Sequence, residues 1–76
     1  MEIILAITSS TSCAIKLIAC NTIEEAVNTM KHIYEKLCRE NSYDYHNTYL
    51  DEEEGYAQVV NGLEQTEFRI GTLSCT

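Results

Sequence analysis

Basic residues are scarce in this chain. Its 76 residues include five lysines and arginines against 12 aspartates and glutamates, which gives a formal net charge of −7. Between residues 41 and 76 the only basic residue is Arg69, whereas seven residues are acidic. Direct binding to DNA, RNA or an anionic membrane needs clustered lysine and arginine. The composition therefore disfavours those ligands and allows a basic protein as the partner.

Proline is absent and glycine occurs only three times. A glycine-built site is therefore disfavoured, and no phosphate loop, dinucleotide fingerprint or nucleophile elbow occurs. No apolar run approaches the roughly 18 residues that a membrane span needs. The apolar opening segment carries Glu2 where a secretory signal would be positively charged. These absences predict a cytoplasmic protein.

Closely spaced cysteine pairs, which typify zinc sites, are also missing. The four cysteines are Cys13, Cys20, Cys38 and Cys75. Without a secretory signal, reduced thiols are expected rather than two disulfides, and no metal or other cofactor is expected. Cys38 with His46, or Cys20 with His32, can be imagined as a nucleophile and its base. No motif supports either pair, so we expect solvated histidines and no enzymatic activity.

The longest periodic segment spans residues 22–40 and predicts an amphipathic helix. Apolar residues recur there at spacings of three and four, which aligns them along one side of a helix. They are Ile23, Ala26, Val27, Met30, Ile33, Tyr34 and Leu37. Thr22 followed by Glu25 is typical of a capping box, and acidic residues suit the first helical turn.

Four apolar or alternating segments predict strands at residues 2–8, 14–20, 56–60 and 65–73. The segment between the helix and the third strand has no clean period, and a short strand is possible near residues 48–50. The order strand, strand, helix, strand, strand indicates an α+β fold. We expect one domain over residues 1–76, a two-layer sandwich with one helix packed on a four-stranded antiparallel sheet.

The first predicted hairpin determines which side chains face the helix. Pairing Ile7 with Ile15 and Leu5 with Leu17 places these four side chains on the helix-facing side. The other face is then too apolar to remain in water, which predicts a homodimer through it. The predicted interface residues are Ile4, Ala6, Ile18 and Cys20.

The sequence of the second predicted hairpin allows two turns of different length. A two-residue turn at Asn61-Gly62 would pair Val59 with Glu64, a poor match for a buried position. A loop over residues 61–64 instead places Val59 opposite Thr66, and Ala57 opposite Phe68. We prefer the longer loop because register follows the apolar pattern where one face is buried. Glu67 and Arg69 then point away from the helix.

Four tyrosines are interleaved with acidic residues between residues 43 and 56. Tyrosine is enriched at binding surfaces because it offers a large contact area with little rotamer entropy to lose. The alternatives are a solvated acidic turn and tyrosines packed over the sheet edge. The predicted partner-binding residues are Tyr45, Tyr49, Asp51, Glu52, Glu53, Glu54 and Tyr56.

Three segments follow one another in the later part of the chain: NTIEEAVNTM at the helix start, DEEEGYAQVV at the acidic turn and EFRIGTL in the closing strand. In this order of segments, residues 21–73 resemble small acidic proteins of bacteriophages and mobile elements, some of which inhibit host defence. The resemblance implies a function in binding, such as blocking the nucleic-acid groove of a defence nuclease. It transfers no catalytic or binding residue.

Three functions remain open at this point. The first is a non-enzymatic inhibitor whose acidic, tyrosine-rich half docks on a basic protein surface. The second is a homo-oligomer that binds or sequesters a nucleotide or other small molecule, with tyrosines stacked on its base. The third is a structural or assembly subunit.

Overall fold

The computed structural model describes residues 2–11, 15–40 and 46–73 and contains one helix and five strands. The elements are β1 (Glu2–Ser9), β2 (Ile15–Cys20), α1 (Ile23–Glu40), β3 (Tyr49–Asp51), β4 (Tyr56–Asn61) and β5 (Glu64–Leu73). The α+β class is confirmed, but the expected sheet of four strands is wrong. β3 pairs with β4 and adds a fifth strand.

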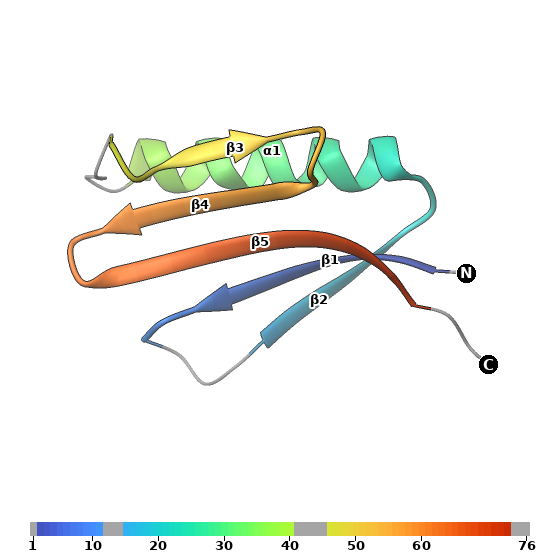
Figure 1. Ribbon diagram of the computed structural model, residues 1–76, viewed down its shortest axis with the longest axis horizontal. Helices are drawn as coiled ribbons and strands as arrows, with labels where there is room; N and C mark the ends of the chain where they lie inside the picture. Colours follow the sequence, from blue (N-terminus) through green and yellow to red (C-terminus); the bar gives the residue numbers. More distant parts are fainter. Residues whose placement is uncertain (1, 12–14, 41–45, 74–76) are drawn as a thin grey trace.

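All neighbouring strands are antiparallel, in the order β2-β1-β5-β4-β3. The first and last strands of the chain lie side by side in the sheet, and their pairing runs from Glu2 opposite Leu73 to Ser9 opposite Thr66 (Figure 1). This long-range pairing joins the β1–β2 hairpin to the β4–β5 hairpin. The two hairpins therefore form one sheet.

Helix α1 begins as the capping-box pattern predicts. The backbone N–H of Glu25 donates to the Thr22 hydroxyl at 3.0 Å, and the carboxylate of Glu25 accepts from the N–H of Asn21 at 3.1 Å. The carboxylate thus reaches one residue further back than in the usual capping box. Two otherwise unpaired backbone donors are satisfied at the point where the chain leaves β2, which fixes the start of the helix.

The core lies between α1 and one face of the sheet. Its fully buried large side chains are Leu5 from β1, Met30 from α1 and Phe68 from β5, joined by Ala57 and Val59 from β4. Their strand positions alternate, as expected for a sheet with one covered face. The opposite face, called here the open face, is turned toward the viewer in Figure 1, where β3 lies in front of α1.

The predicted register of the first hairpin is wrong by one residue. Leu5 pairs with Ile18 and Ala6 with Leu17, not Leu5 with Leu17. A shift of one residue moves every side chain of a strand to the other face. Ile18 packs against the core and Cys20 is buried, so neither belongs to the open face as predicted. Ile4 and Ala6 are on that face, with Leu17 beside them.

The predicted register of the second hairpin is confirmed. Val59 pairs with Thr66 and Ala57 with Phe68. Pairing continues to the ends of the predicted loop, residues 61 and 64, and leaves a two-residue turn. Gly62 has a φ of 62°, and Leu63 after it does not have a positive φ, as in a type II′ turn with glycine in the first central position.

The three glycines predict a graded series of alanine substitutions. Gly55 and Gly62 both have positive φ, but a Cβ at Gly55 would lie 3.1 Å from the Cβ of Ile70, whereas a Cβ at Gly62 meets nothing within 4 Å. Gly62→Ala should cost about 1 kcal/mol from backbone strain, and Gly55→Ala roughly 2–4 kcal/mol because crowding is added. Urea unfolding measures both losses in the free energy of unfolding.

Gly71→Ala is the control in this series. Gly71 has no positive φ and open space around its missing Cβ. Replacing a strand glycine that is free of strain should leave the free energy of unfolding unchanged or raise it by about 0.5 kcal/mol. Equal losses for all three variants would contradict the conformations described.

Candidate functional site

The open face of β3, β4 and β5 carries an open hollow of about 370 Å³ near the β3–β4 turn. We call it the tyrosine hollow. It is lined by Tyr49, Asp51, Glu54, Gly55, Tyr56, Arg69 and Ile70. Tyr56 pairs with Arg69 across β4 and β5 and with Asp51 across β3 and β4. The hollow is therefore assembled from three strands that lie side by side in the sheet.

Two tyrosine rings and one guanidinium form the centre of the hollow. The ring centroids of Tyr49 and Tyr56 lie 5.7 Å apart with an interplanar angle of 41°. The Cζ atom of Arg69 lies 5.1 Å from the centroid of Tyr56, within the range of a cation–π contact. Tyr49 is 49% exposed. The rings hold each other in place and still offer aromatic surface to a partner.

A hydrogen-bond network holds the hydroxyl group of Tyr56. Its hydroxyl lies 3.0 Å from Oε1 of Gln58 and 3.2 Å from Oε1 of Glu67, so it can donate to either oxygen. The side-chain amide of Gln65 donates to the same two oxygens at 3.0 Å. Burial and the negative charge of Glu67 raise the pKa of Tyr56 above its ordinary value. The phenol is thus held in its neutral form.

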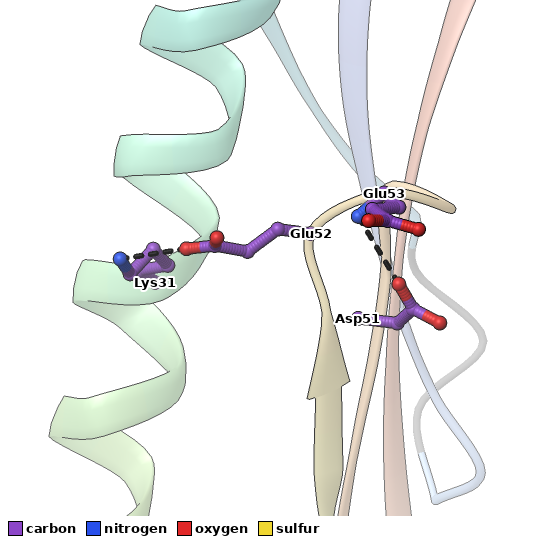
Figure 2. A network of polar contacts seen from close by, with 4 residues as sticks. All are labelled: Lys31, Asp51, Glu52 and Glu53. Atoms are coloured by element: carbon purple, nitrogen blue, oxygen red, sulfur yellow. Dashed lines mark hydrogen bonds and ion pairs between the residues drawn. The ribbon is translucent and has the colours of Figure 1, made fainter.

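The acidic turn between β3 and β4 is ordered by its own first carboxylate. Oδ1 of Asp51 accepts from the backbone N–H groups of Glu53 and Glu54, each at 3.1 Å, which forms an Asx turn. Glu52 turns the other way and pairs with Lys31 of α1 at 2.7 Å (Figure 2). That hydrogen bond and the charge of Glu52 raise the pKa of Lys31.

The structure gathers only part of the predicted site. Tyr49, Asp51, Glu54 and Tyr56 line the same hollow. Glu52 and Glu53 are exposed and, with Glu54, border a second shallow hollow against the start of α1. Tyr45 lies outside the described residues. The predicted acidic cluster therefore points in two directions, toward the open face and toward the helix.

Four residues of this surface were not assigned to a site by sequence. They are Gln58, Gln65, Glu67 and Arg69. Glu67 and Arg69 contact Tyr56 from β5, Gln58 contacts it from two residues along β4, and Gln65 bonds to Gln58 and Glu67. The register of the second hairpin placed Glu67 and Arg69 on the open face. It gave no sign that Arg69 would stack on Tyr56, because that contact depends on side-chain conformation.

Little else in the described residues suggests chemistry. Cys20 and Cys38 are free thiols whose pKa values are raised, mainly by burial, which disfavours the reactive thiolate. Within residues 2–11, 15–40 and 46–73 no three potential metal-ligating side chains come together. The one helix in these ranges is not apolar enough to cross a bilayer.

Comparisons with protein-family models, with curated proteins and with solved structures gave no match for this chain.

The raised pKa of Tyr56 can be tested by alkaline titration. Because the neutral phenol is favoured in the folded state, its stabilising effect is full below the unfolded pKa of about 10 and is lost as pH rises through the folded pKa. Ultraviolet difference spectra should contain a phenolate component from Tyr56 that forms late. Tyr56→Phe should remove this component and flatten the loss of stability above about pH 10.

Tyr49→Phe is the control, since it removes a neighbouring ring hydroxyl but leaves the contact between Tyr56 and Glu67. The late component should persist in this variant. A titration in which Tyr56→Phe leaves the late component in place would contradict the assignment.

Proposed function

We propose that this chain is a non-enzymatic binding protein that docks the tyrosine hollow and its acidic rim on a basic surface of another protein. The observation that carries the proposal is the pairing of Tyr49 and Tyr56 at the surface, with Asp51 and Glu54 lining the same hollow. Rigid aromatic anchors surrounded by carboxylates are suited to a lysine- and arginine-bearing partner.

The charge distribution supports the same kind of partner. The net charge of −7 comes mostly from residues 41–76, and Glu53 and Glu54 are exposed at the β3–β4 turn. A field of one sign speeds the approach of an oppositely charged surface. A basic groove that binds nucleic acid has the required charge. A host defence nuclease, in a phage or mobile-element setting, is the specific partner class that we propose.

A small-molecule binder is the second candidate, because the tyrosine hollow offers two rings and one cation to a planar ligand. A nucleotide would stack on Tyr49 or Tyr56 and place phosphate near Arg69. The lining carboxylates Asp51 and Glu54 repel phosphate, which makes this candidate the weaker one. Native mass spectrometry of freshly purified protein separates the two, since a persistent small adduct favours the ligand.

Reversing the outward-pointing acids should weaken partner binding. Glu53→Lys with Glu54→Lys leaves the Asx-turn acceptor Asp51 and the ion pair of Glu52 in place. We expect at least a tenfold loss of affinity, mainly through slower association, and a weaker dependence on salt. Surface plasmon resonance measures the affinity, the association rate and their salt dependence. The binding partners are an oligoarginine peptide and basic proteins captured from a bacterial extract.

The matched control is Glu35→Lys with Glu40→Lys, which changes net charge equally on exposed positions of α1. It should retain most of the affinity. Equal binding by both double variants, unchanged at high salt, would exclude docking through the acidic turn. Competition by DNA for the same captured protein would identify its nucleic-acid groove as the docking site.

Removing one ring should test anchoring separately from charge. Tyr49 is exposed, and its phenol adds contact area without a large role in the core. Tyr49→Ala should cost about 2 kcal/mol of binding free energy, roughly thirtyfold in affinity, mostly through faster dissociation. Leu63→Ala is the control, because Leu63 is fully exposed at the β4–β5 turn, away from the hollow. Equal affinities for the two variants would remove Tyr49 from the interface.

A further inference from the structure

A second surface of different chemistry lies on the other half of the open face. We call it the apolar patch and define it as Ile4 and Ala6 of β1 with Ile15, Leu17 and Ala19 of β2. These residues share one face because Ile4 pairs with Ala19 and Ala6 with Leu17. Ile15 is 63% exposed and Leu17 is 61% exposed. Two large aliphatic side chains thus project into solvent from a single edge strand.

A hollow of about 340 Å³ lies next to these projecting side chains. It is bordered by Ile4, Leu17 and Arg69, with small residues between them. Ala6 contributes only a methyl group, and Gly71 of β5 contributes none, with nothing within 4 Å of the position its Cβ would take. The hollow therefore exists because large residues surround small ones on the sheet surface.

We infer that a second copy of this chain packs its apolar patch against this one, with Leu17 of each copy entering the hollow over Ala6 and Gly71 of the other. The projecting residue and the recess lie on the same molecule, one strand apart. A two-fold axis parallel to the strands brings each recess onto the partner's Leu17, as an isologous interface requires. The arrangement is a face-to-face packing of two sheets.

The available area fits a weak dimer. The two longer dimensions of the molecule, 40 and 25 Å, limit the open face to about 1,000 Å², and the apolar patch lies on two of its five strands. A standard interface buries about 800 Å² on each partner, so this one falls at the low end of specific interfaces. Glu2 and Glu67 lie on the same face at opposite ends of the patch and limit its extent.

The position of the patch keeps the tyrosine hollow accessible. The patch belongs to β1 and β2, whereas Tyr49 and Tyr56 belong to β3 and β4 at the opposite side of the sheet. Arg69 of β5, which lies between them, borders both hollows. The dimer therefore carries two tyrosine hollows on its outer strands. The inference does not depend on the proposed function, and loss of the dimer would leave single-site docking intact.

Sedimentation velocity between about 1 and 500 μM tests the inference, a range suited to weak self-association. The unaltered chain should shift from monomer to dimer with rising concentration. Leu17→Asp should remove the dimer by burying a charge in the recess. Leu63→Asp, the same change at a fully exposed leucine, should dimerise like the unaltered chain. A monomer at all concentrations for the unaltered chain would overturn the inference.

Gly71→Val tests the recess itself. The site has open space and no positive φ, so the monomer should fold with unchanged or higher thermal stability, which circular dichroism checks. The added side chain fills the hollow, and the dimer should weaken at least tenfold. Dimerisation of Gly71→Val at the strength of the unaltered chain, with Leu17→Asp monomeric, would indicate pairing of β2 edges and would overturn the face-to-face arrangement.

Discussion

The structure depends on one constraint, the covering of a five-stranded sheet by a single helix. Five strands spaced about 4.8 Å apart span about 19 Å between the outer two, whereas a helix with its side chains is about 10–12 Å wide. α1 buries Met30 against Leu5 and Phe68 on one face of the sheet. Among the described residues no element covers the other face. Strand residues alone therefore determine its chemistry, apolar on β1 and β2 and polar on β4 and β5.

The helix, four strands and the second register were predictable because local patterns determine them. Val59 and Phe68 occupy alternating apolar positions that only one register buries together. Residues 14–20 lack such a pattern, because Leu17 and Ile18 suit the core equally well. In the structure Ile18 packs against the core, and β2 ends at Cys20, two residues before the capped start of α1 at Thr22. The position of that helix determines which side of β2 is covered. That information lies outside the hairpin, so the predicted register was one residue out.

The candidate site was predictable as a group of neighbours in sequence but not as a geometry. Tyr49, Asp51 and Tyr56 converge because one tight turn joins their strands. Arg69 comes from β5, and its stacking on Tyr56 follows from a cross-strand pair and a side-chain conformation. The ion pair between Glu52 and Lys31 could not be predicted either. It depends on where α1 lies relative to the acidic turn, and the number of acidic residues in the sequence does not give that position.

At the acidic turn, net charge and direct contact affect different steps of binding: charge affects the rate of association, and contact affects the lifetime of the complex. Asp51 holds the turn together and Glu52 ties it to α1, so neither carboxylate is fully available to a partner. The field of the net charge extends over roughly a Debye length of 8–10 Å, beyond any single side chain, and acts on the rate of approach. The lifetime of a complex depends instead on desolvated contact, which carboxylates at an exposed rim supply poorly. In the docking that we propose, the rings of Tyr49 and Tyr56 supply that contact; Arg69 and the other ring lie against Tyr56 in the structure.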